Sequence, residues 1–399
     1  MRIMLVSSLY PPEQVGGAEV LVAQLARDLV AAGHQVAVAC LSREATGREE
    51  ADGVTVYRMG HGPIFFPMDW GKKSRVDRAL YKVTTQLGLK VLDALGEAIE
   101  DFSPEVVNTH SLAELSPRIW SLAAARKIPT VHTLHDFSGL CTNGAMFKDG
   151  RACEGQHPKC KVYGALHGIE GRHVDGVIGV GRDILARHLA AGQFSKTDVR
   201  RQAVIWNPVE APPARPARIL GDAPVFGFLG RIEGSKGADL LLEACRLLPP
   251  DGWRLKIAGR AVDGDAPYQR MAEGLPVDFL GFVDRDSFFE QIDCLIAPPL
   301  WPEAFGRTVA EAYLRGVPVI GADIAGVAEQ VAAVAPQGLF KVGDAGSLAD
   351  RMAAFIEDNA AFQPTPQAVE AFARRVSPDE VAKRYVDMYQ MVVGGRELT

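Results

Sequence analysis

The amino-acid sequence predicts an α/β protein made of two doubly wound, Rossmann-like domains that face each other across a cleft. Three observations support this prediction. Short, continuously apolar segments alternate with segments of helical periodicity in both halves of the chain. A proline-rich stretch interrupts this alternation after residue 207. The length of 399 residues also exceeds that of one ordinary domain.

The first half of the chain, residues 1–207, reads as strands joined by helices. Its predicted strands are apolar along their whole length, which is typical of a parallel sheet covered on both faces. They span residues 2–8, 35–41, 54–59, 105–110, 130–134 and 176–180. The clearest predicted helices span residues 18–32, ended by Gly33, and 76–99.

The second half repeats this architecture after a linker predicted at residues 208–224. We assign residues 225–377 to the second domain. Its predicted strands span 225–229, 255–258, 277–280, 294–297 and 317–320. A helix predicted at 378–392 closes the chain. In doubly wound sheets ligands bind beyond the carboxyl ends of the strands, so two such domains would place a ligand in the cleft between them.

Composition and charge exclude several classes of protein. The net charge of −6 argues against a nucleic-acid binder. No apolar run approaches 18 residues, so we expect no spanning helix. The N-terminal MRIMLVSSLYPP lacks a small-residue cleavage site and is interpreted as a buried first strand, not as a signal peptide. Six cysteines in a chain of this length favour free thiols and a cytoplasmic protein.

The segment GRIEGSKG, residues 230–237, follows the first strand of the second domain. Its glycines permit a tight strand-to-helix turn, and Arg231 and Lys236 fall at the carboxyl edge of the sheet. Two cations beside backbone N–H groups suit a diphosphate and could neutralise it without a metal ion. The alternative is that both are solvated loop charges, because glycine-rich loops are weak motifs.

The segment EAFGRTVAE, residues 303–311, contains two acids eight positions apart. The helix is predicted to begin near Phe305, which leaves Glu303 in the preceding loop and places Glu311 in the second turn. Carboxylates accept pairs of hydrogen bonds and therefore suit the vicinal diols of sugars. The alternative is that Glu303 complements the helix dipole and Glu311 is a surface acid.

Several of these segments together resemble one family. GRIEGSKG and EAFGRTVAEA, with AGVAEQ at 325–330, YPPEQVGGAE at 10–19, HTLHDF at 132–137 and GFV at 281–283, are similar to the retaining family-four glycosyltransferases of GT-B fold. The resemblance covers nearly the whole chain, in the right order. It implies that residues 1–207 bind the acceptor, that residues 225–377 bind a nucleotide-sugar, and that the helix at 378–392 packs back on the first domain.

The resemblance also implies roles for individual residues. Arg231 and Lys236 would bind the donor diphosphate, and Glu311 the ribose. Glu303 would hold the donor sugar, and His135 would lie near the reacting sugar while His132 is structural. Two residues separate these histidines, so they point to opposite faces if the strand continues. The remaining implied donor-site residues are Gly16, Gly17, Phe282, Val283, Ala304, Phe305 and Gly306.

The activity implied is transfer of a sugar from a UDP- or GDP-linked donor to a saccharide or lipid-linked acceptor, with retention of configuration, in polysaccharide or glycolipid biosynthesis. Neither a metal nor an enzyme nucleophile is implied, because the leaving phosphate oxygen takes the acceptor's proton. One alternative is a non-catalytic nucleotide- or carbohydrate-binding protein. A dinucleotide-dependent oxidoreductase is disfavoured, since no G-x-G-x-x-G follows the first strand.

Three features of the sequence have more than one interpretation. Arg307 replaces the apolar residue common in the family, and it either reaches the cleft and alters donor choice or is a solvent-facing charge. Residues 64–83 combine aromatic side chains with five cations, including Lys72 and Lys73. This segment either docks on an anionic membrane at its inner face or is a solvated helix start with core aromatics.

Cys141, Cys153, His157 and Cys160 are close together in the sequence. Three thiols and an imidazole could bind a structural zinc ion, although the spacing is looser than in ordinary zinc motifs. Unpaired thiols or an incidental disulfide are the alternative.

Overall fold

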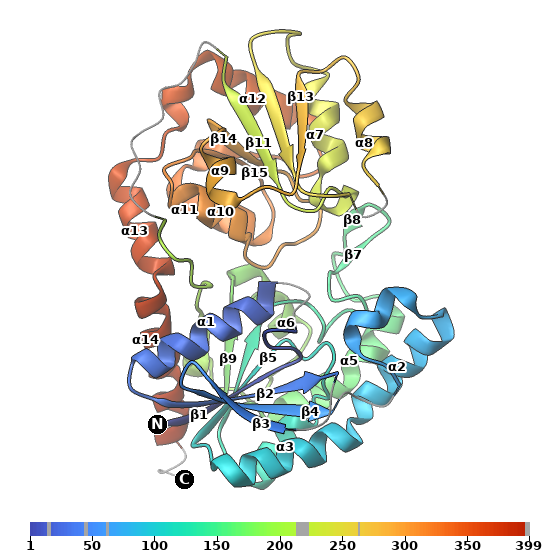
Figure 1. Ribbon diagram of the computed structural model, residues 1–399, viewed down its shortest axis with the longest axis vertical. Helices are drawn as coiled ribbons and strands as arrows, with labels where there is room; N and C mark the ends of the chain where they lie inside the picture. The colour runs from blue at the N-terminus through green and yellow to red at the C-terminus, as the bar shows by residue number, and fades with distance from the viewer. Residues whose placement is uncertain (14–16, 44–46, 61–63, 213–222, 262–263, 396–399) are drawn as a thin grey trace. The chain divides into compact units, whose positions relative to one another are not determined.

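A computed structural model describes residues 1–13, 17–43, 47–60, 64–212, 223–261 and 264–395. The chain divides into two compact units. Unit 1 contains residues Met1–Gly144, Gly155–Pro208 and Pro378–Thr399, and unit 2 contains Ala145–Glu154 and Val209–Ser377. Figure 1 shows a sheet with helices around it in each unit. The predicted linker, 208–224, lies largely outside the described residues.

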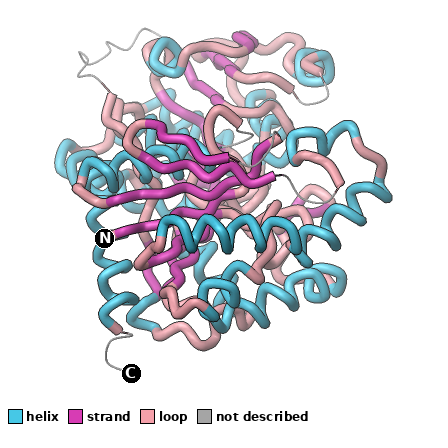
Figure 2. The backbone as a smooth tube through the Cα atoms, turned by 60° about the horizontal axis from the view of Figure 1, so that its bottom comes forward, coloured by secondary structure: helices cyan, strands magenta, loops and turns pink. Residues whose placement is uncertain are grey.

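Unit 1 is built on an eight-stranded sheet that is parallel except at one edge. In spatial order the strands are β10 (Gln202–Val204), β9 (Gly176–Gly179), β6 (Thr130–Leu134), β5 (Val106–His110), β1 (Arg2–Ser7), β2 (Gln35–Ser42), β4 (Val54–Gly60) and β3 (Gly47–Ala51). Its helices are α1 (Gly17–Ala31), α2 (Arg75–Leu87), α3 (Leu89–Phe102), α4 (Ile119–Ala125), α5 (Pro158–Glu170), α6 (Arg182–Ala190) and α14 (Pro378–Gly394). In Figure 2 helical segments run alongside the magenta strands.

Unit 2 has a six-stranded, wholly parallel sheet. In spatial order the strands are β13 (Val277–Gly281), β12 (Arg254–Ala258), β11 (Val225–Leu229), β14 (Cys294–Ala297), β15 (Val319–Ala322) and β16 (Leu339–Phe340). Its helices are α7 (Ala238–Cys245), α8 (Ala266–Met271), α9 (Arg285–Phe289), α10 (Arg307–Tyr313), α11 (Ala325–Val334), α12 (Ala345–Glu357) and α13 (Pro366–Val376). The short strands β7 (Phe147–Lys148) and β8 (Arg151–Ala152) pair with each other as a separate ribbon.

Strand order explains where loops gather in each sheet. In unit 2 the chain leaves β11 toward β12 and β13, whereas β14, β15 and β16 lie on the other side of β11. The strands β11 and β14 are neighbours, but the chain leaves them in opposite directions, so the loops that follow them separate at this point. Doubly wound sheets bind ligands at such a position. In unit 1 the same divergence occurs between β1 and β5.

The C-terminal helix α14 is part of unit 1. Its apolar residues, including Tyr389 and Val392, are buried in the same core cluster as α1 and the central strands. The Tyr389 hydroxyl also donates a 2.7 Å hydrogen bond to Asn108 Oδ1 on β5. Burial of large apolar side chains and a satisfied polar pair hold the helix on the sheet.

The single helix predicted over 76–99 is wrong, because two helices, α2 and α3, meet at Gly88. Gly88 adopts a left-handed φ of 62°. A Cβ at this position would lie 2.4 Å from the Ser116 Cβ. Both the backbone angle and the close approach require glycine, so the helix ends here.

Candidate functional site

The loops after β11 and β14 are joined by a charged pair in unit 2. Lys236 lies in the short 3-10 turn Gly234–Lys236 after β11, and Glu303 lies in the loop after β14. The Lys236 Nζ donates to both carboxylate oxygens of Glu303 at 3.0 Å. The two side chains are only 20% and 23% exposed. The Lys236 ammonium also lies 4.9 Å from the Trp301 ring centre.

Glycine permits the close packing of these loops. Gly237 has φ 76°, and a Cβ there would lie 1.8 Å from the carbonyl oxygen of Pro298. The Leu300 N–H donates to the carbonyl of Ser235. The backbone after β11 is therefore in direct contact with the backbone after β14, which positions Lys236 beside Glu303.

Arg231 is the second cation of the loop after β11. Its side chain is 66% exposed and lies 3.1 Å from Glu233 Oε1. A surface pair of this kind contributes at most about 1 kcal/mol to stability. The guanidinium can therefore exchange Glu233 for an anionic ligand at small cost.

The backbone between the two glutamates is supported by α11. Gly306 caps α10 with φ 82° and ψ 61°. The buried Gln330 donates its amide to the carbonyls of Phe305 and Gly306. A Cβ on Gly326 would lie 2.7 Å from Phe305 Cα. The AGVAEQ segment thus fixes the conformation of residues 304–306.

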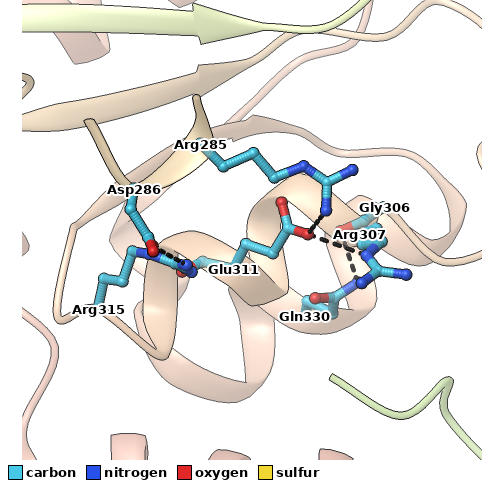
Figure 3. A network of polar contacts seen from close by, with 7 residues as sticks. All are labelled: Arg285, Asp286, Gly306, Arg307, Glu311, Arg315 and Gln330. Atoms are coloured by element: carbon cyan, nitrogen blue, oxygen red, sulfur yellow. Dashed lines mark hydrogen bonds and ion pairs between the residues drawn. The ribbon is translucent and has the colours of Figure 1, made fainter. Parts of the chain in front are cut away.

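Glu311 is held by two arginines, as Figure 3 shows. The Arg285 Nη1 lies 2.7 Å and the Arg307 Nε 2.9 Å from the same Glu311 oxygen, Oε1. The Glu311 side chain is 5% exposed. A carboxylate so buried needs charged partners, and these two supply them.

Arg307 is not simply a solvent-facing charge, because it is paired with a buried carboxylate. It is one-third exposed and is paired with Glu311 one helical turn away. Four residues after Glu311, Arg315 donates to the backbone carbonyl of Glu311 and pairs with Asp286 at 2.6 Å, which ties α9 to the end of α10.

The loop after β13 contains the residues assigned to a nucleobase. Phe282 is 85% exposed, an unusual state for a large aromatic side chain. Val283 is half-buried, and Arg285 follows at the start of α9. Because Arg285 contacts Glu311, this loop lies beside α10.

The carboxyl edge of the sheet in unit 1 bears histidines and hydroxyls. His110 ends β5, and its Nδ1 lies 2.9 Å from the Nε2 of His135, which follows β6. Burial lowers the pKa of His135 to about 4, and it also lowers the pKa of His110 well below its usual value. Both rings are therefore neutral at pH 7. The Nδ1 atom of His135 is buried without a partner in the described residues.

A small pocket lies beside His135. His132 points into the interior, with its Nδ1 2.8 Å from Thr109 Oγ1. The pocket is lined by Ser111, Leu112, Trp120, His132, Thr133, Leu134, His135, Asp136, Ser138, Gly139, His167, His188 and Gln193. Burial also lowers the pKa of His167 and His188 to about 4. Every histidine at this pocket is thus uncharged near neutrality.

Two glycines assigned to the site follow β1. Gly17 is the first residue of α1 and is exposed. A Cβ there would meet no atom within 4 Å. Gly16 lies outside the described residues.

Comparison with known proteins identifies the family. The model of the glycosyl transferase 4-like domain matches residues 16–208, and the model of glycosyl transferases group 1 matches residues 214–376. The chain is a group 1 glycosyltransferase. Its fold is GT-B.

Three proteins illustrate the similarity. The glycosyltransferase is 28% identical over 331 residues to an uncharacterized 42.6 kDa protein in the cps region of Klebsiella pneumoniae, covering 82% of this chain and 87% of the relative. It is 31% identical over 166 residues to the lipopolysaccharide core biosynthesis mannosyltransferase LpsB of Rhizobium meliloti, covering 38% and 47%. The structure of Anabaena HepE in complex with UDP superposes with a TM-score of 0.68, at 18% identity, covering 98% of this chain and 100% of HepE.

None of the six cysteines of the glycosyltransferase forms a disulfide. Cys160 lies on the first turn of α5, with its sulfur 3.9 Å from Thr142 Oγ1. Among the described residues no group of three or more His, Cys, Asp and Glu side chains is placed to hold a metal ion. Cys141, Cys153, His157 and Cys160 are therefore not gathered into such a group.

Three of the four aromatic residues in the segment 64–83 of the glycosyltransferase are buried. Phe65, Phe66 and Tyr81 are at most 4% exposed, and the Phe65 and Tyr81 rings stack with centres 4.5 Å apart. Lys82 lies 5.3 Å from the Trp70 ring centre. The burial of these three side chains agrees with the interpretation of the segment as one with core aromatics. No helix in the described part of the chain is long and apolar enough to cross a bilayer.

Sequence reasoning missed three residues that complete these clusters. Arg285 lies in no recognisable sequence motif. It contacts Glu311 only because of the order of the strands in the sheet. Gln330 stands in the AGVAEQ segment, which pointed to the family but gave this residue no role. His110 had a usable signal, since it is a polar residue at the carboxyl end of a predicted strand.

Proposed function

We propose that this glycosyltransferase moves a sugar from a nucleoside-diphosphate donor to a saccharide or lipid-linked acceptor with retention of configuration. The observation that carries the proposal is the Lys236–Glu303 pair, with Arg231 in the same loop, at the diverging loops of β11 and β14. Cations and a carboxylate at one edge match the two chemical parts of a sugar diphosphate, the anion and the hydroxyls.

The donor in this proposal is UDP- or GDP-linked. Support for a uracil nucleotide comes from HepE, whose structure contains UDP. Arg231 and Lys236 would hold the diphosphate, and Glu303 the sugar hydroxyls. Glu311 would hold the ribose, with Arg285 and Arg307 keeping its carboxylate in place. The contacts are completed by Ala304, Phe305 and Gly306 around the sugar, and by Phe282 and Val283 against the base.

The reaction we propose needs no metal ion, because Arg231 and Lys236 compensate the charge of the leaving diphosphate. The bond between the anomeric carbon and the phosphate oxygen breaks. The acceptor hydroxyl oxygen bonds to that carbon on the same face, and its proton moves to the leaving phosphate oxygen. Neutral His135 lies near the reacting sugar in this scheme and can exchange hydrogen bonds with hydroxyls without adding charge.

We place the acceptor on unit 1 and the reaction in polysaccharide or glycolipid biosynthesis. The relatives named for a cps region and for lipopolysaccharide core synthesis support that pathway class. The proposed location is the cytoplasm, at the inner face of the membrane, with contact to anionic lipid through residues 64–83. We assign no role to nucleic acid, given the net charge of −6.

Calorimetric titration with UDP- and GDP-sugars, in chelator and with Lys341→Ala as control, tests the donor assignment. Lys341 is a 78% exposed lysine of unit 2 in a surface pair. We expect one nucleotide class to bind wild type and Lys341→Ala equally, and Lys236→Ala about tenfold or more weakly. NMR of the product's anomeric proton then decides retention. Equal donor binding by Lys236→Ala, or an inverted product, would contradict the proposal.

A further inference from the structure

The helix α2 presents its apolar residues to solvent and its polar ones to the protein. Val76, Leu80, Val83 and Leu87 are 75%, 51%, 61% and 50% exposed. Their spacing of four, three and four residues places them on one stripe of the helix. On the opposite face Tyr81 and Thr85 are buried, and Tyr81 stacks on Phe65. The helix is therefore held by its polar and aromatic side while an aliphatic stripe remains uncovered.

The neighbouring helix α5 continues this pattern. Val162 and Ile169, seven residues apart, are 78% and 53% exposed. Lys82 of α2 lies 6.0 Å from the ring centre of Tyr163 on α5, so the two helices are in contact. Of the thirteen large hydrophobic side chains that are exposed in the described chain, these two helices contribute six. Such a concentration marks an interaction surface.

The charges around the stripe indicate what kind of partner it binds. Residues 67–90 contain six basic and two acidic residues, in a chain whose net charge is −6. Lys72 is 81% exposed, and Arg75 and Lys90 are also exposed. On α5, Lys159 and Lys161 are exposed beside Val162. An aliphatic stripe bordered by cations matches the boundary between anionic headgroups and acyl chains.

We propose that the exposed stripe of α2, together with Val162 and Ile169 of α5, inserts into the surface of an anionic membrane. This surface is called the α2–α5 face below. The proposal specifies which side chains make the membrane contact given under the proposed function. It rests on that function only in expecting a lipid-linked acceptor. It assigns the insertion to aliphatic side chains, whereas the buried aromatics of 64–83 form the base on which α2 rests.

Flotation of the whole protein with vesicles tests the α2–α5 face directly. The vesicles are phosphatidylcholine alone or mixed with phosphatidylglycerol. The variant Val76→Ser/Leu80→Ser/Val83→Ser removes the stripe. Val199→Ser is the matched control, because Val199 is equally exposed, at 75%, and lies elsewhere in unit 1. We expect binding to the mixed vesicles to fall about tenfold or more in the triple variant and to be unchanged in the control.

Two further arms separate the outcomes. At about 1 M salt, where charges are screened beyond about 3 Å, partial binding should persist in wild type and be lost in the triple variant. In titrations without vesicles, the affinity for the sugar nucleotide should be the same in all three proteins. This separates an error in the donor assignment from an error in the membrane assignment. Wild type that ignores the mixed vesicles, or a triple variant that still floats, would overturn the proposal. A wild-type dimer that the triple variant abolishes would assign the face to a second copy of the chain instead.

Discussion

The two units share a parallel sheet with loops at the carboxyl ends of its strands, yet opposite chemistry is found there. In unit 2 those loops contain ion pairs, Lys236 with Glu303 and two arginines with Glu311. In unit 1 they contain neutral histidines, such as His110 and His135, and the hydroxyl of Ser111, which donates to the carboxylate of Asp136. All nine histidines of the sequence fall within unit 1. Fixed charges suit a charged sugar nucleotide. Uncharged groups that donate and accept hydrogen bonds suit a polyol.

The largest effect should come from the ion pair of unit 2. Lys236→Ala and Glu303→Gln should each lower kcat/KM by about a hundredfold or more, because each removes an interaction with a charge or hydroxyl of the donor. Initial rates of sugar transfer measure this. Lys341→Ala is again the control. Rates near wild type in either variant would show that the edge of unit 2 is not the donor site.

Acidic pH should lower the free energy of unfolding of unit 1 more than that of unit 2. Burial lowers the pKa of His135, His167 and His188 to about 4. Below pH of about 6.5 these side chains gain protons in the unfolded state first, so the free energy of unfolding of unit 1 falls as the pH drops toward 4. Each pKa unit of difference corresponds to about 1.4 kcal/mol per histidine.

Amide hydrogen exchange followed by mass spectrometry resolves this effect by region. We expect peptides of β5, β6 and α6 to lose protection between about pH 6.5 and 4 before those of β11, β14 and β15, since unit 2 contains no histidine. His188→Gln should flatten the dependence for unit 1. Two results would contradict this prediction: an equal loss of protection in both units, or a pH dependence in unit 1 that His188→Gln does not change.

A smaller effect should follow from the arginines around Glu311. Arg285→Ala and Arg307→Ala each remove one partner of a buried carboxylate, so we expect the KM for the donor to rise about fivefold to tenfold with a smaller change in kcat. Arg285→Lys should restore part of the loss because Arg285 makes a single contact, through Nη1. If removal of one arginine lowered KM, that arginine would compete with the donor for Glu311 instead of supporting it.

The sequence indicated the two sheets, their order along the chain and the segments that surround each site, because apolar runs and glycine-rich turns are local signals. It did not reveal β3, whose residues GREEA are all exposed and lack an apolar pattern. Nor did it reveal the pairing of Arg285 with Glu311, which depends on loops of non-consecutive strands. The exposed stripe of α2 escaped notice because its spacing is that of an ordinary core-facing helix.

The C-terminal helix α14 has a consequence for the order of synthesis. Tyr389 bonds to Asn108 across 281 positions of sequence, so unit 1 cannot complete its core until α14 has been synthesised. Unit 2, formed mainly by the continuous segment Val209–Ser377, can fold earlier. During that interval the face of unit 1 that α14 covers remains exposed to other chains. A chain shortened by its last twenty residues would keep every residue assigned to the donor, yet leave this apolar face permanently open.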